Sequence, residues 1–288
     1  MVKSKVGRII SRFKNFSSQI RSNFKNELTI EYHDLTLKYA TRSPIAKRWF
    51  YPRYISGKRV HEPPIAALIR AELDPESTFF DVGANLGFFT VLAANICTAS
   101  NGSVHAFELD PTLIPLVEDS LHLNDQCGAV ELNCVACAGE TGRFHTFRAA
   151  QKNNPSTNQI VPDGTGGRGV SAQAITVTLD HYRKHTGTSP DLIKMDIEGA
   201  ETLAIPGMLD LVEKVRPTLI LEVHPEDVRR LGGTPATLVN QLREAGDYST
   251  VSHVESHRQE VEHPDEALEP LDMSMFEGDR PVVVLFSP

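Results

Sequence analysis

The hydrophobic and polar positions of the chain follow one rhythm from residue 78 to the last residue. Short apolar runs alternate with stretches in which apolar residues recur every three or four positions. The pattern predicts β-strands over 78–82, 102–109, 129–138, 142–149, 174–182, 190–197, 216–225 and 280–288, and helices over 87–97, 111–124, 234–246 and, as a short piece, from Gly199. Strands that alternate with helices form a mostly parallel sheet with helices on both faces. We therefore expect an α/β fold.

The residues before 78 follow other patterns. Apolar residues over 1–27 recur three or four apart, and basic residues lie between them, which predicts an amphipathic helix. Residues 28–60 begin with strand-like alternation, whereas 63–73 opens with two prolines and predicts a helix. We divide the chain into a basic helical extension over 1–27, a cap with its lead-in helix over 28–77, and a main domain over 78–288.

The segment FFDVGANLGFFT contains an acid, two glycines and an asparagine where the first strand of the main domain ends. In a doubly wound sheet, ligands bind at the carboxyl ends of the strands. Gly83 and Gly87 let the backbone turn tightly and approach a ligand, and Asn85 tolerates positive φ. The dinucleotide fingerprint G-x-G-x-x-G is absent, because Asn85 and Phe88 occupy its second and third glycine positions. Asp81 would repel a pyrophosphate, but it suits a ligand with an amino group.

The second strand of the main domain ends in another acid, Glu108. A carboxylate in this place can accept hydrogen bonds from both hydroxyls of a ribose. An acid for an ammonium group, glycines for close approach and an acid for a ribose together match S-adenosylmethionine. The predicted cofactor-binding residues are therefore Asp81, Gly83, Asn85, Gly87 and Glu108.

Five segments of the chain resemble the FkbM family of S-adenosylmethionine-dependent methyltransferases in their order and spacing. They are FFDVGANLGFFTVLAA, VHAFELDP, ITVTLDHY, LIKMDIEGAE and RPTLILEVHPE, which together cover about residues 60–225. KMDIEGAE is the segment most specific to the family. The resemblance implies a Rossmann-like, seven-stranded methyltransferase sheet and O-methylation of a hydroxyl on a glycan, a lipid-linked compound or a secondary metabolite.

Polar residues also gather near the predicted strands 190–197 and 216–225. Alternation along a strand places Lys194 and Asp196 on one face, and a buried lysine needs a paired charge. Asp196 and Glu222 are its candidate partners. Asp196, Glu198 and His224 fall near the carboxyl ends of the strands, over the predicted acceptor pocket.

Removal of the hydroxyl proton by a base assists O-methylation. The ordinary pKa of imidazole favours His224 as this base, whereas the family motif favours Asp196. With Lys194 they form the predicted catalytic set, and Glu198 and Glu222 are assigned to acceptor binding. Alternatively, Lys194, Asp196 and Glu222 form a structural ion network. Glu201 is expected to belong to the following helix.

Glu62 comes just before the helix predicted over 63–73. Family members often have an acid followed by proline here, so the resemblance assigns Glu62 to the acceptor pocket. An acid at this place also stabilises a helix through the helix dipole. Both interpretations stay open.

Charge is unevenly distributed along the chain. Residues 1–26 contain seven Lys and Arg and no acid, while the rest carries 22 Lys and Arg against 37 Asp and Glu, a net charge of −15. This acidic body argues against nucleic acid as the main partner. The basic helix could contact an anionic membrane, pack on its own domain or be a transit peptide. Four cysteines do not suggest a disulfide framework, so we expect a cytoplasmic protein, peripheral at a membrane if the basic helix binds there.

No metal site is expected. Cys134 and Cys137 form a single C-x-x-C, and no second pair follows. The acidic segment 253–271 contains histidines, but their spacing fits no zinc motif, and the segment is predicted to be a surface loop.

Two other functions stay open beside O-methylation. The first is N-methylation of a small molecule or protein, although DIEG replaces the N/D-P-P-Y/F stretch that often holds an amino group. The second is a non-catalytic binding module with the same fold, although the cofactor residues are intact. The sequence specifies neither the acceptor nor the oligomeric state.

Overall fold

A computed structural model describes residues 26–44, 46–47, 60–148, 159–160, 171–255 and 263–288. The predicted basic helix lies outside these residues, apart from its last two positions. Within the described ranges, no helix is long and apolar enough to cross a membrane.

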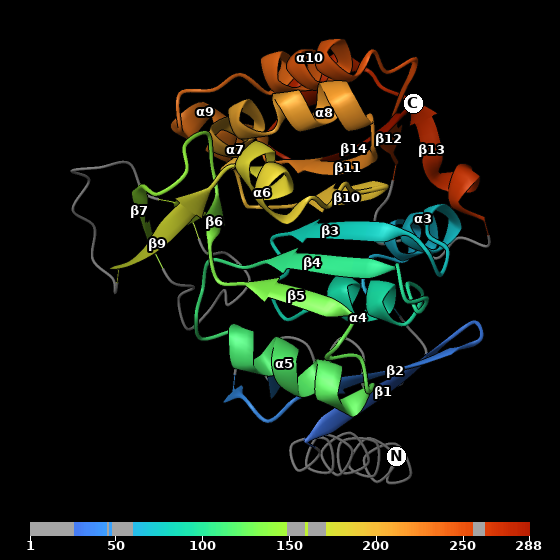
Figure 1. Ribbon diagram of the computed structural model, residues 1–288. Coiled ribbons are helices and arrows are strands. Elements are labelled where there is room, and N and C mark those ends of the chain that lie inside the picture. The colour runs from blue at the N-terminus through green and yellow to red at the C-terminus, as the bar shows by residue number, and fades with distance from the viewer. Residues whose placement is uncertain (1–25, 45, 48–59, 149–158, 161–170, 256–262) are drawn as a thin grey trace, which may run out of the picture.

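The centre of the molecule is a sheet of eight strands in the order β13-β12-β14-β11-β10-β3-β4-β5 (Figure 1). The strands are β3 (Thr78–Val82), β4 (Ser103–Phe107), β5 (Val130–Asn133), β10 (Leu192–Met195), β11 (Thr218–Val223), β12 (Thr250–Val254), β13 (Leu268–Pro270) and β14 (Val282–Ser287). The strands from β5 to β11 pair in parallel, and β14 runs antiparallel to β11 and β12. The expected seven-stranded, mostly parallel sheet is confirmed, with the short β13 as an additional edge strand.

Helices cover both faces of this sheet. Phe79 and Leu192 are buried on one face, and their neighbours Phe80 and Ile193 are buried on the other. The first face carries α3 (Pro63–Glu72), α4 (Phe88–Ala94) and α5 (Ile114–Leu123). The second face carries α6 (Leu179–Thr186), α7 (Glu201–Ala204), α8 (Leu209–Val215), α9 (Pro225–Arg230) and α10 (Pro235–Gly246). In the described ranges, 3₁₀ turns span Ile205–Gly207, Pro264–Ala267 and Met273–Glu277. Burial on both faces explains why the central strands are mostly apolar, with Asp81, Lys194 and Glu222 as the charged residues within β3, β10 and β11.

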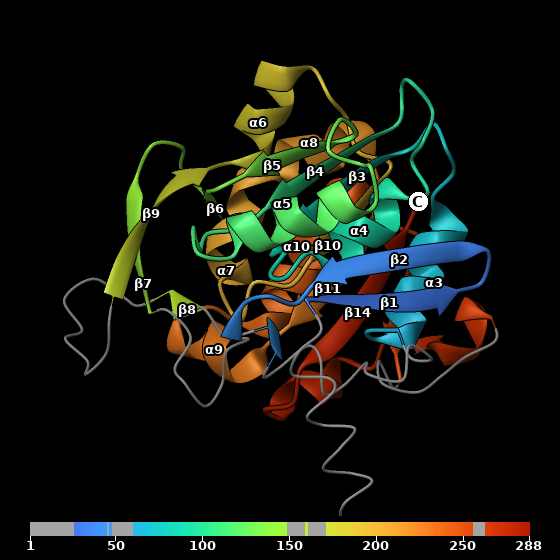
Figure 2. The same ribbon diagram turned by 90° about the horizontal axis from the view of Figure 1, so that it is seen from below.

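An N-terminal hairpin packs against the first face (Figure 2). Its strands, β1 (Glu27–Tyr32) and β2 (Leu35–Ala40), pair antiparallel, and their alternate residues are buried. Tyr39 stacks on Phe88 of α4 with ring centroids 5.1 Å apart. The strand-like alternation therefore forms a hairpin that shares its core with the sheet.

A second sheet lies beyond the carboxyl ends of β4 and β5 (Figure 1). It has the order β6-β9-β7-β8 and consists of β6 (Ala136–Cys137), β7 (Phe144–Arg148), β8 (Gln159–Ile160) and β9 (Ser171–Val177). The single strand predicted over 129–138 is therefore wrong: it is β5 and β6, in different sheets. The chain turns between them, where the Val135 N–H donates to Asn133 O at 3.1 Å.

The strand predicted over 174–182 is wrong in its second half, because α6 begins there at Leu179. The Thr178 side chain accepts a hydrogen bond from the His181 N–H at 3.0 Å. This N-cap satisfies a free donor of the first turn and starts the helix.

Other boundaries also differ from the prediction, and α8, α9 and β12 were not predicted. The helix predicted over 111–124 begins only at Ile114, since Asp110 accepts hydrogen bonds from the N–H and the hydroxyl of Thr112 and holds a turn. The segment 253–271 is not a continuous loop, because β12 ends in it and β13 pairs with β12.

Candidate active site

The carboxyl ends of β3 and β10 meet at the centre of the sheet. The chain leaves β3 towards α4 on the first face and β10 towards α7 on the second. In open α/β sheets, ligands bind in the crevice at such a switch point. The Asp196 N–H donates to Val82 O at 3.0 Å, which holds the two strand ends together. The segments predicted for the cofactor and for the acceptor therefore lie side by side.

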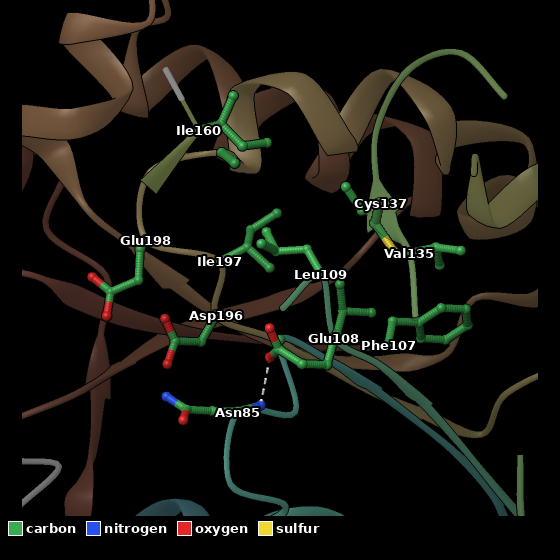
Figure 3. A pocket seen from close by; sticks show the side chains of 14 residues that line it. Asn85, Phe107, Glu108, Leu109, Val135, Cys137, Ile160, Asp196, Ile197 and Glu198 are labelled. Atoms are coloured by element: carbon green, nitrogen blue, oxygen red, sulfur yellow. Dashed lines mark hydrogen bonds between the residues drawn. The ribbon is translucent and has the colours of Figure 1, made fainter. Parts of the chain in front are cut away.

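A pocket opens at this switch point and contains about 570 Å³ of empty space, its open mouth included. Figure 3 shows the carboxylates of Asp196 and Glu198 at one end of the pocket and the apolar Phe107 and Val135 at the other. Of the predicted site residues, the lining includes Gly83, Asn85, Glu108, Asp196 and Glu198.

The turn after β3 depends on residues with positive φ. Gly83 has φ +86°, and a Cβ added there would lie 1.9 Å from the backbone oxygen of Asp196. Asn85 follows with φ +51°. Gly87 does not line the pocket; a Cβ there would lie 2.8 Å from Val117, so this glycine allows α4 to pack against α5.

Glu108 presents a carboxylate whose orientation is fixed by the backbone. Its Oε2 accepts a hydrogen bond from the Asn85 N–H and its Oε1 accepts one from the Asp110 N–H, each at 2.8 Å (Figure 3 shows the first). Burial raises the pKa of Glu108 to about 7, although the two N–H groups oppose this shift. The side chain is thus oriented before any ligand binds.

Asp81 lies behind the pocket and is fully buried. Its Oδ2 accepts a hydrogen bond from the Thr90 hydroxyl at 2.6 Å, and its Oδ1 has no hydrogen-bond partner among the described residues. Burial raises the pKa of Asp81, while the positive charge of Lys194 on the adjacent strand lowers it in part. Contact between Asp81 and an ammonium group therefore stays a prediction.

Lys194 is buried between two carboxylates and does not line the pocket. It lies opposite Asp81 in the strand register, and its Nζ lies 3.5 Å from Asp196 Oδ2. Burial favours the neutral amine, but the charges of Asp196 and Asp81 outweigh it and raise the pKa of Lys194. This geometry supports the ion-network interpretation for Lys194.

Glu201 is the candidate that the sequence pattern missed. It begins α7, as expected of a helix residue, but its side chain is completely buried. Its Oε1 accepts hydrogen bonds from the Ile197 N–H at 3.3 Å and the Gly199 N–H at 3.2 Å. These bonds hold the turn in which Glu198 has φ +55°. An acid two residues after a glycine, at the start of a helix, was the available signal for such a turn.

Four carboxylates surround His224, which follows β11 and is 8% exposed. Its Nε2 lies 3.4 Å from Glu198 Oε2, 3.8 Å from Glu222 Oε1 and 3.9 Å from Asp196 Oδ1, and its Nδ1 lies 3.5 Å from Glu201 Oε1. Burial would lower the pKa of His224, but these acids, Glu201 first, raise it to about 10. The free imidazole is therefore protonated at neutral pH, so its ordinary pKa does not support the role of base.

The carboxylates differ in their affinity for a proton. Burial raises the pKa of Glu198 to about 8, and the charge of Asp196 adds to this. Burial and Asp196 also raise the pKa of Glu222 well above its usual range. For Asp196, burial is outweighed by the charges of Lys194 and His224, which lower its pKa. Asp196 therefore stays ionised at neutral pH.

Glu62 precedes α3 with φ +44° and makes no hydrogen bond to the helix N-terminus through its side chain. Its charge contributes to the raised pKa of Lys194 and of Glu222. Glu62 is not among the residues that line the pocket, so its assignment to the acceptor stays a prediction.

Comparison with known proteins identifies a family model that covers most of the main domain. The model described as methyltransferase FkbM domain matches residues 81–248. None of the curated proteins in the comparison matches the chain.

Several solved structures match this chain at low sequence identity. A methyltransferase FkbM from Methylobacillus flagellatus KT is 16% identical, with a TM-score of 0.47, over 85% of this chain and 55% of that one. A putative methyltransferase from Streptococcus mutans in complex with SAH is 10% identical, with a TM-score of 0.44, over 80% of this chain and 99% of that one. A SAM-dependent O-methyltransferase from Thermotoga maritima is 10% identical, with a TM-score of 0.40, over 92% of this chain and 86% of that one. The chain thus spans about half the length of the Methylobacillus protein.

Proposed function

The chain belongs to the family of methyltransferase FkbM domains, and we propose that it is an S-adenosylmethionine-dependent O-methyltransferase. The proposed acceptor is a hydroxyl of a glycan, a lipid-linked compound or a secondary metabolite. One observation carries the proposal: the oriented carboxylate of Glu108 and the acidic pair Asp196 and Glu198 line the same pocket, across the β3–β10 boundary.

The described residues fit the cofactor, which would supply a methyl group on a sulfonium centre. The Glu108 carboxylate is a preformed hydrogen-bond acceptor for ribose hydroxyls. Gly83 has no side chain to cover its backbone beside the Glu108 carboxylate, and a side chain at this position would not fit. Phe107 and Val135 supply an apolar wall for an adenine ring. These groups account for binding and orientation of the cofactor.

The acceptor would bind at the acidic end of the pocket. The ionised carboxylate of Asp196 is a hydrogen-bond acceptor, which suits a hydroxyl donor, and the neighbouring Glu198, with a pKa of about 8, keeps a carbonyl oxygen as acceptor when it is protonated. Lys194 keeps Asp196 ionised, and Glu201 holds the turn that carries Glu198. Since methyl transfer is an in-line displacement, fixing the oxygen in place contributes much of the acceleration.

The cofactor site predicts a pH-dependent affinity. Ribose hydroxyls donate to an ionised carboxylate, so lowering the pH through the pKa of Glu108, about 7, should weaken binding. From pH 6 to pH 8, the ionised fraction rises from about a tenth to about nine tenths, so we expect about a tenfold gain in affinity. Glu108→Gln should weaken binding at pH 8 by about 1–3 kcal/mol and remove this gain. Titration calorimetry with S-adenosylmethionine measures both effects.

The exposed Glu118 offers a matched control for this change. Glu118→Gln should keep the affinity and the pH profile of the unmodified chain. Equal affinities and profiles in all three proteins would remove the cofactor assignment.

The acceptor site predicts a separate effect on turnover. Asp196→Asn should leave cofactor affinity nearly unchanged and lower methyl transfer by about 10²-fold or more, because the acceptor hydroxyl loses an ionised partner. A screen of hydroxyl compounds with labelled cofactor supplies the assay, and Asp125→Asn on the surface is the control. Normal turnover combined with a lower melting temperature in Asp196→Asn would leave only the structural ion network. Cofactor binding without transfer to any acceptor would favour the binding module.

A further inference from the structure

Three side chains at the acidic end of the pocket are spaced like the ligands of one ion. Asp196, Glu198 and His224 each offer one ligand atom, and these atoms all lie within 4.8 Å of one another. Bonds from divalent metals to oxygen and nitrogen are about 2.0–2.2 Å long, so two ligands of one ion lie up to about 4.4 Å apart. A small rotation of either carboxylate closes the set. We infer that Asp196, Glu198 and His224 form a binding site for a divalent metal ion.

A buried oxygen without a hydrogen bond points to the same place. Lys194 interacts with Asp196 through Oδ2, which leaves Asp196 Oδ1 3.9 Å from His224 Nε2. Among the described residues, Oδ1 is buried and has no hydrogen-bond partner. Such an atom in a native structure needs an explanation, and a bound ion is one. An ion between Oδ1 and Nε2 would satisfy both atoms.

Glu201 supplies the outer support that metal-binding histidines usually have. A ligating imidazole commonly presents its second nitrogen to a carboxylate, which fixes the ring and its tautomer. His224 Nδ1 lies 3.5 Å from Glu201 Oε1, so Nε2 is the nitrogen that faces Asp196 and Glu198. The completely buried Glu201 is a positioning residue in this arrangement.

The charge around the site favours a cation. Asp196, Glu198, Glu201 and Glu222 lie within 4 Å of the imidazole, whereas in the described part of the chain Lys194 is the one Lys or Arg within 4 Å of any of these acids. Lys194 contacts Asp196 on its Oδ2 side and also lies opposite Asp81 in the register of β3 and β10. A dication bound on the Oδ1 side would replace the proton that the imidazolium carries and would offset the charge of these acids.

The donor atoms indicate which ion would bind, and the pocket indicates which part of the acceptor would coordinate that ion. Two carboxylates and an imidazole suit ions such as Mn²⁺ or Zn²⁺. Asp196 and Glu198 line the pocket, so the remaining coordination positions would open towards the acceptor. This last step rests on the proposed function: the acceptor would carry a hydroxyl beside a second oxygen, as a vicinal diol does. The ion would hold that hydroxyl and make it more acidic.

Direct metal binding tests the inference without an activity assay. The full chain is freed of metal with a chelator and titrated with Mn²⁺, with free Mn²⁺ followed by electron paramagnetic resonance, and then with Zn²⁺ by calorimetry. We expect one ion per chain. His224→Gln and Glu198→Gln should weaken binding by more than about tenfold, and Glu201→Gln by about tenfold. Glu226→Gln, the same change at an exposed site two residues after His224, should have no effect.

The outcomes separate this inference from the proposed function. A chain that binds S-adenosylmethionine but has no one-to-one site for either ion overturns the metal site alone. Metal affinity that is unchanged in folded His224→Gln and Glu198→Gln also overturns it. If both variants lose their native circular dichroism, the number of ions bound per unmodified chain still decides whether the metal site exists. A chain that binds the ion but not S-adenosylmethionine supports the metal site and overturns the cofactor assignment.

Discussion

Replacing Lys194 by methionine should lower the free energy of unfolding by about 3–5 kcal/mol, the usual cost of removing one partner of a buried ion pair. Lys194 faces Asp81 in the register of β3 and β10, and its Nζ lies 3.5 Å from Asp196 Oδ2. Without it, two carboxylates stay in a buried place with no adjacent ammonium group. Methionine nearly fills the volume of the lysine stem, so the loss reports charge rather than a cavity. Urea denaturation at pH 7.5 measures the change.

Lys214 provides the matched control for this prediction. It is half exposed and pairs with Asp210 one turn away on α8, an arrangement that contributes about 0.3–0.5 kcal/mol. Lys214→Met should therefore change stability little. Adding Asp81→Asn to Lys194→Met should restore part of the loss, because a neutral amide replaces an uncompensated charge. Equal losses in the two lysine variants would mean that the charge of Lys194 contributes no more than a surface charge.

Most of the strand and helix order could be predicted from the sequence, because the parallel strands are buried on both faces. Such strands appear as short apolar runs, as in Leu219–Leu221, and the helices between them keep their own period. Two of the errors fall where one local hydrogen bond decides. The Thr178 side chain starts α6 inside an apparent strand, and the turn at Asn133 divides another strand between two sheets. Periodicity carries no information about such bonds.

The candidate site could be predicted where it depends on a local motif. Gly83, Asn85 and Glu108 line the pocket because each comes at or just after a strand end. No local motif determines the register between strands, and this register places Lys194 opposite Asp81.

The proton affinity of His224 could not be predicted for a related reason. It depends on carboxylates that come from two strand ends and from the turn and helix after β10. Glu201 was missed because its side chain turns back to the preceding turn, which the helical pattern does not reveal. Contacts of this kind exist only in the folded chain.

Gly83→Ala should weaken S-adenosylmethionine binding and lower methyl transfer by at least about 10²-fold, since a displacement of about 1 Å near a site can slow a reaction by that factor. The new Cβ would lie 1.9 Å from the backbone oxygen of Asp196, and a backbone atom cannot rotate away as a flexible side chain can. The ends of β3 and β10 would have to separate, although the Asp196 N–H to Val82 O bond holds them together. This shift would move the cofactor and acceptor ends of the pocket at once. Calorimetry measures the affinity, and urea denaturation measures the stability.

Gly142 separates the effect of the contact from that of the backbone conformation. It has φ +80°, close to the +86° of Gly83, but a Cβ added there would have no atom within 4 Å. Gly142→Ala should therefore cost only about 1–2 kcal/mol of stability for the left-handed conformation and leave cofactor affinity unchanged. Gly83→Ala should lose the same amount and about 1–3 kcal/mol more for overpacking. If the two variants lose the same stability and both bind the cofactor normally, the close approach of Gly83 to Asp196 has no role in forming the pocket.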